Sequence, residues 1–319
     1  GLAAPHIFTD YFEFPLALGG CALLAWLLSE RQRQDMLRLV LTLALVAYAA
    51  GEVYAPLARA RFASRNFYGA LKVVDEGRGN DAVRIMFHGN ISHGSQWLAP
   101  ARRRLATTYY GPESGGALAI ESVAGDGRRI GVVGLGPGTL AAYGRAGDYF
   151  KFYELNPLVI HLARTQFTYL SDSPARIEIV EGDARLSLAA EPPQQFDVLL
   201  VDAFAGDSIP VHLLTREAFE IYFRHVKPEG VLAFHVSNRF LDLREVVAAQ
   251  AAALGRRALA VTSPGHTADR TYEATWVLVS ASRDLLNLPV FKNAGQPVEL
   301  SRRRRLWTDD YSNLFQALK

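Results

Sequence analysis

The sequence is poor in the features that define several large classes of protein. It has a single cysteine, Cys21, which excludes a disulfide framework within the chain and a cysteine-rich zinc site, and we expect no bound metal. The formal net charge is only +2, so no strong overall field favours a nucleic-acid partner. Internal repeats and low-complexity segments are absent. No basic stretch precedes the first apolar run, which argues against a secretory signal peptide.

Long hydrophobic runs are concentrated at the start of the chain. Hydrophobic residues make up 50% of the 319 residues, enough for one sizeable domain with additions. Two apolar runs, 12–28 and 36–50, are joined by the polar residues 29–35. We expect residues 1–65 to form an apolar helical hairpin that associates with a membrane through residues 12–58, at the short end of the about 20 residues that cross a bilayer. The alternative is a pair of buried core helices.

Arginines flank this hairpin unequally. Arg31 and Arg33 lie between the two runs, whereas Arg59, Arg61 and Arg65 follow the second. Positive charge is enriched on the cytoplasmic side of membrane segments, so we expect a cytoplasmic catalytic domain.

The remainder divides into a small β unit and a larger domain. Within residues 66–118, strand-like stretches at 70–75 and 82–88 enclose a turn-rich segment, which predicts a hairpin followed by a polar loop at 88–96. Apolar runs and helical patterns alternate in residues 119–319, which predicts an α/β fold with a doubly wound, mostly parallel, Rossmann-like sheet. We expect seven strands, at 129–134, 149–154, 176–181, 196–202, 230–236, 258–262 and 275–281.

A glycine-rich turn follows the first strand of that sheet. Gly134, Gly136 and Gly138 let the backbone approach a ligand closely. Glu154 ends the next apolar run, where a carboxylate can accept hydrogen bonds from both hydroxyls of a ribose. The alternative is an ordinary tight turn between a strand and a helix. A dinucleotide motif would place its third glycine one residue later, which disfavours a dehydrogenase.

Acidic residues also stand at or near the ends of the next two runs. Asp183 can accept a hydrogen bond from an adenine amino group, and it can also be the N-cap of the following helix. Asp202 faces the reacting end of a ligand in such a crevice, where partial burial would raise its proton affinity and suit it to act as a base. Asp207 follows five residues later, as a second acid of the site or as a loop cap.

The C-terminal part contains a cluster of acids and aromatic rings. Asp309, Asp310 and Tyr311 follow Trp307 closely and could line a pocket for a cationic substrate. The alternative is a solvated C-terminal turn.

Three segments resemble the spermidine synthase, or polyamine aminopropyltransferase, family, and more closely its membrane-fused relatives. They are Gly-Leu-Gly-x-Gly-Thr at 134–139, Asp-Ala-Phe-x-x-Asp-x-Ile-Pro-Val-His-Leu-Leu-Thr at 202–215, and Trp-Thr-Asp-Asp-Tyr-Ser-Asn-Leu at 307–314. The resemblance implies the class I S-adenosylmethionine-dependent methyltransferase fold. It also implies that the small β unit covers the active site.

The resemblance implies roles for individual residues. Asp183 and Ala184 would read the adenine, and Asp202 would deprotonate an attacking amine. Tyr110 is the nearest match to the tyrosine of the family's Tyr-His-Glu motif, which is otherwise missing. Pro137 stands where the family has an aspartate that holds the primary amine of the donor. Both departures affect the donor tail and the acceptor, whereas the nucleoside half is intact.

Three functions are compatible with these residues. The leading one transfers an aminopropyl group from decarboxylated S-adenosylmethionine to a putrescine-like amine and releases methylthioadenosine. The second acts on S-adenosylmethionine itself, by methyl transfer or sulfonium cleavage, with His93 and Gln96 contacting its tail or a substrate; the alternative for both is loop hydrogen bonding. The third is a non-catalytic sensor of S-adenosyl compounds. A homodimer is compatible with the sequence but not fixed by it.

Overall fold

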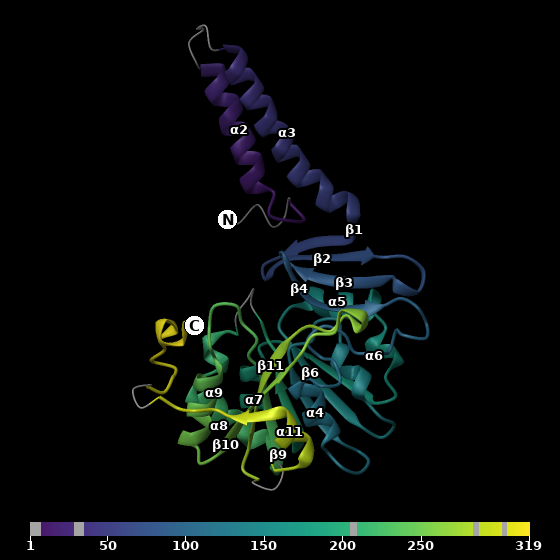
Figure 1. Cartoon of the computed structure of the whole chain (residues 1–319), viewed down its shortest axis with the longest axis vertical. Helices are drawn as coiled ribbons and strands as arrows, with labels where there is room; N and C mark the ends of the chain where they lie inside the picture. The colour runs from purple at the N-terminus through teal and green to yellow at the C-terminus, as the bar shows by residue number, and fades with distance from the viewer. Residues whose placement is uncertain (1–7, 29–34, 205–208, 283–286, 302–304) are drawn as a thin grey trace.

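The computed structural model has three parts arranged along its long axis. Figure 1 shows a helical hairpin, a small sheet below it and a larger α/β domain at the other end. The structure describes residues 8–28, 35–204, 209–282, 287–301 and 305–319. It is the structure of a single chain, and the homodimer stays a prediction.

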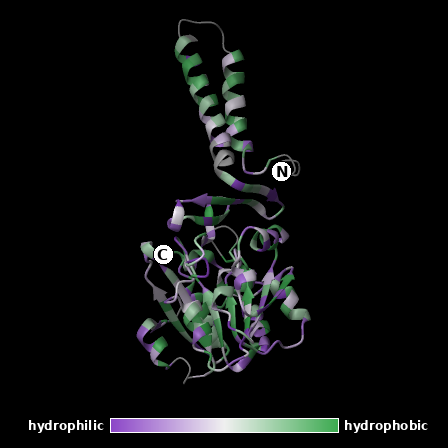
Figure 2. Ribbon diagram, turned by 90° about the vertical axis from the view of Figure 1, so that its right-hand side faces the viewer, coloured by the Kyte–Doolittle hydropathy of each residue, from purple (hydrophilic) through white to green (hydrophobic). Residues whose placement is uncertain are grey.

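The hairpin consists of two helices that lie side by side, α2 (Glu13–Leu28) and α3 (Asp35–Arg59). They project away from the rest of the molecule and are largely apolar on the surface (Figure 2), with Leu24 57% and Leu41 60% exposed. They are therefore not the buried core helices of the alternative. The expected membrane segment is not supported either. In the described part of the chain, no helix has both the length and the hydropathy needed to cross a bilayer.

The small β unit is a four-stranded antiparallel sheet in the described residues, larger than the predicted hairpin. The sequence suggested a loop at 88–96, but most of this segment forms a strand. The strand was not predicted because its residues are polar. Ser95 and Gln96 are nevertheless buried, and their side chains form hydrogen bonds. The first strand also takes residues that we had assigned to the hairpin. In sheet order the strands are β1 (Ala60–Asn66), β2 (Gly69–Glu76), β3 (Val83–His88) and β4 (Ile91–Trp97).

The larger domain contains the predicted α/β sheet, with corrections. All seven expected strands are present, and the five neighbours from β9 to β7 are parallel. The described residues form eight strands rather than seven, because the short β12 adds an edge, and β11 and β12 run antiparallel to their neighbours. The order is β12 (Gly295–Pro297), β10 (Arg257–Ser263), β11 (Ala274–Ser280), β9 (Val226–His235), β8 (Phe196–Val201), β5 (Arg129–Val133), β6 (Tyr149–Glu154) and β7 (Arg176–Glu181).

Helices cover both faces of this sheet. Buried strand residues alternate between two cores: Val198 and Leu200 face one, Leu199 and Val201 the other. This alternation gives each helical layer an apolar surface to pack on. The first core includes residues of α4 (Gly115–Glu121), α5 (Pro157–Thr165) and α11 (Pro289–Ala294), and the second includes residues of α7 (Ala184–Ala190), α8 (Arg216–His225) and α9 (Arg244–Ala253).

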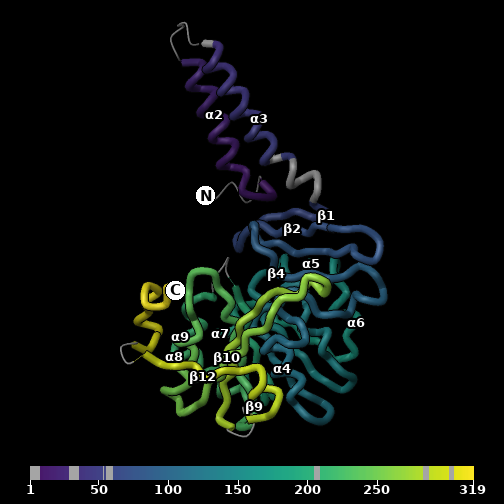
Figure 3. The backbone as a smooth tube through the Cα atoms, viewed as in Figure 1, coloured from purple at the N-terminus to yellow at the C-terminus, as the bar shows by residue number. Residues whose placement is uncertain are grey.

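The C-terminal segment returns along the second layer. Figure 3 shows the chain running from β12 past α8 and α9 to its end. The carbonyl oxygen of Trp307 accepts hydrogen bonds from the Arg216 amide (2.9 Å) and the Gln250 side chain (2.7 Å). These bonds tie the segment to α8 and α9.

Two polar contacts position the small sheet over the larger one. Arg84 Nη1 donates to the carbonyl oxygen of Gln166 (2.7 Å), just after α5. Asn66 Nδ2 donates to Asn156 Oδ1 (2.6 Å), at the residue that caps α5. The two sheets therefore enclose the space above the carboxyl ends of β5, β6 and β8.

Candidate active site

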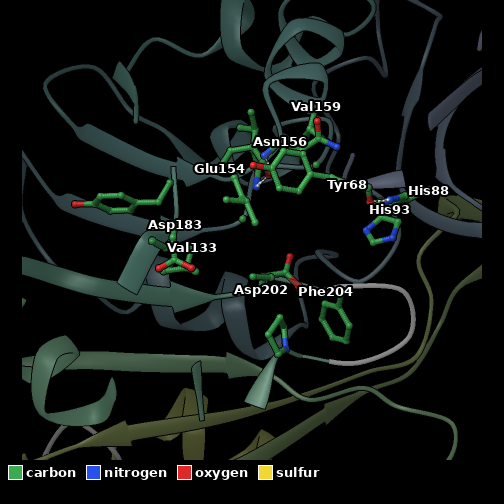
Figure 4. Close-up of a pocket in the computed structure, with 18 of the residues that line it drawn as sticks. Tyr68, His88, His93, Val133, Glu154, Asn156, Val159, Asp183, Asp202 and Phe204 are labelled. Carbon is green, nitrogen blue, oxygen red and sulfur yellow. Dashed lines mark hydrogen bonds between the residues drawn. The ribbon is translucent and has the colours of Figure 1, made fainter. Parts of the chain in front are cut away.

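A cavity of about 180 Å³ lies between the small sheet and the carboxyl ends of the parallel strands. Figure 4 shows Glu154, Asp183, Asp202 and His93 arranged around it. In open α/β sheets, ligands bind at this edge. Seven of the residues predicted from the sequence line the cavity: His93, Gly134, Gly136, Glu154, Asp183, Ala184 and Asp202.

The turn after β5 requires glycines because the backbones of other segments approach it closely. Gly134 has φ +98°, and a Cβ there would lie 2.3 Å from the carbonyl oxygen of Asp202. Gly136 has φ +52°, and its Cβ would lie 2.9 Å from the carbonyl oxygen of His93. Gly138 also has a positive φ, +85°, but it packs on Leu170 and does not line the cavity. The turn is thus in close contact both with β4, through His93, and with the residue that follows β8, Asp202.

Glu154 lies at the end of β6 and anchors the turn. Its carboxylate accepts the amide of Leu135 (3.0 Å) and that of Asn156 (2.8 Å). Burial raises the pKa of Glu154 to about 7, and these amide donors oppose the shift. The remaining lone pairs face a cavity, where ribose hydroxyls can donate to them.

Asp183 caps a helix, as one of its two predicted roles requires, and it also lines the cavity. It is the N-cap of α7 and accepts the amide of Leu186 (2.8 Å). It also lines the cavity beside Ala184, and its second oxygen lies 3.2 Å from His212 Nε2. An acceptor at this position can take a hydrogen bond from an adenine amino group.

Asp202 follows β8 and is held on both oxygens. The hydroxyl of Tyr110 donates to Oδ2 (2.6 Å), and Nδ1 of His235 lies 2.7 Å from Oδ1. Burial, followed by the charge of Asp202, holds the pKa of Tyr110 well above its usual value. Tyr110 is therefore a neutral donor, and Asp202 is the carboxylate that reaches the cavity.

His235 was not predicted from the sequence, although a signal was present. It is the last residue of β9 and lies at the carboxyl edge of the sheet. Glu154, Asp183 and Asp202 were predicted as site residues because they lie at the same edge. His212 was also missed; it lies inside the 202–215 segment that carries the family resemblance and lines the cavity.

His93 and Gln96 have different environments. His93 lines the cavity, and burial, together with the neighbouring His88, lowers its pKa to about 4. Its buried Nε2 has no hydrogen-bond partner in the described part of the chain. The side chain of Gln96 is instead hydrogen-bonded to Thr168 and to the carbonyl oxygen of Arg103, and it does not line the cavity.

The C-terminal acids lie outside the cavity. Asp309 forms an ion pair with Arg185 and accepts from Thr215 (2.8 Å), so it fastens the C-terminal segment to the second helical layer. Asp310 is exposed, and Tyr311 lies under the guanidinium of Arg305 (4.3 Å). The residues expected to line a pocket for a cation thus form a structural turn. Asp207 lies outside the described residues.

Among the described residues, no group of three or more His, Cys, Asp or Glu side chains could hold a metal ion.

Two curated proteins match parts of the chain. No family model matches the chain. It is 27% identical over 163 residues to a probable polyamine aminopropyl transferase of Bifidobacterium longum, covering 50% of this chain and 34% of that protein. It is 32% identical over 117 residues to a polyamine aminopropyltransferase of Vibrio vulnificus, covering 35% and 38%.

A solved structure matches a larger part of the chain and shares its fold. A probable spermidine synthase from Corynebacterium glutamicum superposes with a TM-score of 0.55 at 20% identity, covering 67% of this chain and 77% of that structure. The chain spans little more than a third of the curated relatives that it matches. It is similar in sequence to polyamine aminopropyltransferases and shares the fold of a spermidine synthase.

Proposed function

We propose that this protein is an aminopropyltransferase that moves an aminopropyl group from decarboxylated S-adenosylmethionine to a putrescine-like amine. The observation that carries the proposal is Asp202, a carboxylate held at the cavity beside a nucleoside-type site. The similarity to polyamine aminopropyltransferases supports the same reaction.

The nucleoside half of the donor is assigned to the glycine turn and two acids. Glu154 accepts the ribose hydroxyls, and Asp183 with Ala184 reads the adenine. Gly134, Gly136, Glu154, Asp183 and Ala184 line the cavity together with Asp202, and we orient the donor with its sulfonium toward Asp202.

The reaction requires a base. An amine with a Lys-like pKa of ~10.4 is protonated at neutral pH, and exposing its lone pair costs about 4.6 kcal/mol. Asp202 accepts that proton as the nitrogen attacks the propyl carbon next to the sulfonium. The new C–N bond forms, the C–S bond breaks, and its electron pair stays on sulfur in neutral methylthioadenosine. Holding the reactants in line supplies much of the remaining acceleration.

His93 is our candidate for the donor's primary amine. The aspartate that holds this amine in the family is replaced by Pro137. A histidine with a pKa of about 4 is neutral at pH 7 and can accept from an ammonium through an unprotonated ring nitrogen. Asp207 remains our candidate for the distal charge of the acceptor, because Asp309 is paired with Arg185.

A second candidate function uses intact S-adenosylmethionine. It is favoured by Pro137, because a carboxylated donor tail would be repelled by an aspartate at that position. A sensor domain would bind either donor without turnover.

The test supplies purified protein with decarboxylated or intact S-adenosylmethionine, with and without putrescine, and measures products by mass spectrometry. We expect methylthioadenosine and spermidine from the decarboxylated donor plus putrescine. Asp202→Asn should abolish both while still binding methylthioadenosine in calorimetry, and Glu220→Gln on the exposed face of α8 should be unaffected. Turnover of the intact donor alone would establish the second candidate, and binding without turnover would establish the sensor.

We also propose that the α2–α3 hairpin associates with a lipid surface, as the sequence suggested. The support is its exposed apolar side chains, among them Leu24 and Leu41. The protein should sediment with phosphatidylcholine vesicles that contain phosphatidylglycerol. A Leu24→Glu, Leu41→Glu variant should lose this binding, whereas Phe240→Glu, at an exposed site on the α/β domain, should keep it. Equal sedimentation of all three proteins would contradict the proposal.

A further inference from the structure

A chain of hydrogen bonds runs behind Asp202, on the side away from the cavity. Nδ1 of His235 lies 2.7 Å from Asp202 Oδ1, and Nε2 of the same ring lies 2.9 Å from Ser237 Oγ. The backbone amide of Thr275 in β11 donates to Ser237 Oγ (2.8 Å). The chain therefore joins three elements of the sheet: the end of β8, the end of β9 and β11.

The direction of each bond follows from chemistry at the two ends. An ionised Asp202 carboxylate only accepts, so Nδ1 of His235 carries the proton between them. A neutral ring then has Nε2 as an acceptor, and Ser237 must donate to it. At the far end the Thr275 amide only donates, and it fills a lone pair of Ser237 while leaving the hydroxyl proton free for His235. The contact with Asp202 therefore decides the assignment, and the Thr275 end is compatible with it.

Packing fixes the plane of the His235 ring. The ring stacks on Trp276 with centroids 4.8 Å apart and planes at 15°. Tyr109 and Phe204 close two further sides, each with centroids 5.1 Å away. The His235 side chain is 4% exposed. The stack fixes the plane of the ring, and the contacts with Asp202 and Ser237 select which of its two in-plane orientations is adopted.

We propose that His235, oriented by Ser237, is a positioning residue for Asp202: it keeps the Nδ1–H tautomer pointed at Oδ1. This role rests on the proposed transfer reaction. With Oδ1 bound by His235 and Oδ2 by Tyr110, the carboxylate cannot rotate, and its remaining lone pairs are presented to the amine in the cavity.

The order Ser237, His235, Asp202 is that of a hydrolase triad, but the roles run the other way. Asp202, not the serine, lines the cavity at the glycine turn. Ser237 Oγ already accepts the Thr275 amide, so the hydroxyl orients the histidine. The titratable groups against the ring are Asp202, Tyr109 and Tyr110; Phe204 and Trp276 carry none.

The first test needs no turnover. The chain has eight histidines, and ¹⁵N labelling of their rings with His235→Asn as the assignment variant reports the protonated nitrogen of His235. We expect Nδ1–H at neutral pH in the wild type, and the Nε2 resonance should shift in Ser237→Ala because that nitrogen loses its hydrogen-bond donor. Nε2–H in the wild type, or an unchanged Nε2 resonance in Ser237→Ala, would overturn the proposal.

The second test separates positioning from folding by comparing kcat with the KM of the donor substrate. His235→Leu removes the hydrogen-bond donor to Oδ1, so kcat should fall roughly tenfold or more while the KM of the donor substrate stays within about twofold. His235→Asn keeps a hydrogen-bond donor near the place of Nδ1 and should restore most of kcat. Equal loss of kcat in both variants would show a merely structural role. If the wild-type protein had no transfer activity, the proposed function would be wrong. The ¹⁵N measurement of the His235 tautomer would still decide the orientation of the ring.

Discussion

The backbones of Gly134 and Asp202 touch. A Cβ on Gly134 would lie 2.3 Å from the Asp202 carbonyl oxygen, and the Asp202 amide donates to Val133 (2.8 Å). The nucleoside turn after β5 and the base after β8 are thus one rigid unit. A side chain added at Gly134 would displace the backbone of Asp202.

Gly134→Ala should therefore destroy the site. The substitution meets both a left-handed backbone and a carbonyl that cannot move, so we expect a loss of more than about 2 kcal/mol of unfolding free energy and no measurable binding of methylthioadenosine. The measurements are denaturant unfolding and calorimetry.

Gly125→Ala is the matched control. Gly125 also has a positive φ, +82°, but nothing lies within 4 Å of its Cβ position. It should lose only the backbone cost, about 1–2 kcal/mol, and bind normally. Equal effects of the two variants would mean that the contact with Asp202 is unimportant.

Binding of the nucleoside should depend on pH through Glu154. Its pKa of about 7 lies above its usual range because of burial, so the free protein holds it partly protonated near neutrality. Ribose hydroxyls donate to the carboxylate and favour ionisation. Affinity for methylthioadenosine should therefore rise as the pH increases from about 5.5 to about 8, with release of a proton.

The same raised pKa affects stability with the opposite sign. The folded state binds the proton more tightly than the unfolded state, so stability of the free protein should fall as the pH rises from about 4.5 toward about 7. Glu154→Gln should flatten both profiles and weaken binding, as seen by calorimetry and thermal unfolding. A variant that kept either slope would assign that slope to another group.

Position in the sheet made most of the site predictable. Glu154, Asp183 and Asp202 were found because a carboxylate after a buried parallel strand must lie at the carboxyl edge. Side-chain partners were not predictable in this way. Asp309 looked free in the sequence, but it meets Arg185 from a segment 124 residues away. Long-range pairs of this kind depend on the packing of helices rather than on local pattern.

The fold shows the same division between pattern and packing. The seven strands of the large sheet follow from apolar runs bounded by turns. The short edge strand β12 and the polar strand β4 were missed, because each is formed by pairing with a neighbour rather than by its own hydrophobicity.

A buried ion pair stabilises the start of β5. Arg128 and Asp148 have side chains 0% and 1% exposed, and Arg128 Nη2 lies 2.6 Å from Asp148 Oδ2. Asp148→Asn leaves the buried guanidinium with only the more exposed Glu121, 3.6 Å away, as a counter-charge, so we expect a loss of about 3 kcal/mol in urea unfolding. Glu220→Gln breaks the exposed pair with Arg216 and should change stability by less than about 0.5 kcal/mol. Similar losses in the two variants would show that burial does not set the strength of these pairs.

Pro137 sets the last prediction, which concerns the choice of donor. Its ring packs against Gly94 of β4, where a Cβ would lie 2.5 Å from Pro137 Cγ, so this position faces the strand that carries His93. A carboxylate there would attract the primary amine of a decarboxylated donor and repel the carboxylate of the intact one. Pro137→Asp should raise the ratio of kcat/KM for decarboxylated over intact S-adenosylmethionine by about tenfold. Pro137→Asn has the same shape without the charge and should leave the ratio near that of the wild type. Identical ratios in the two variants would place the donor tail away from this turn, and His93 would then have to recognise it from the opposite wall.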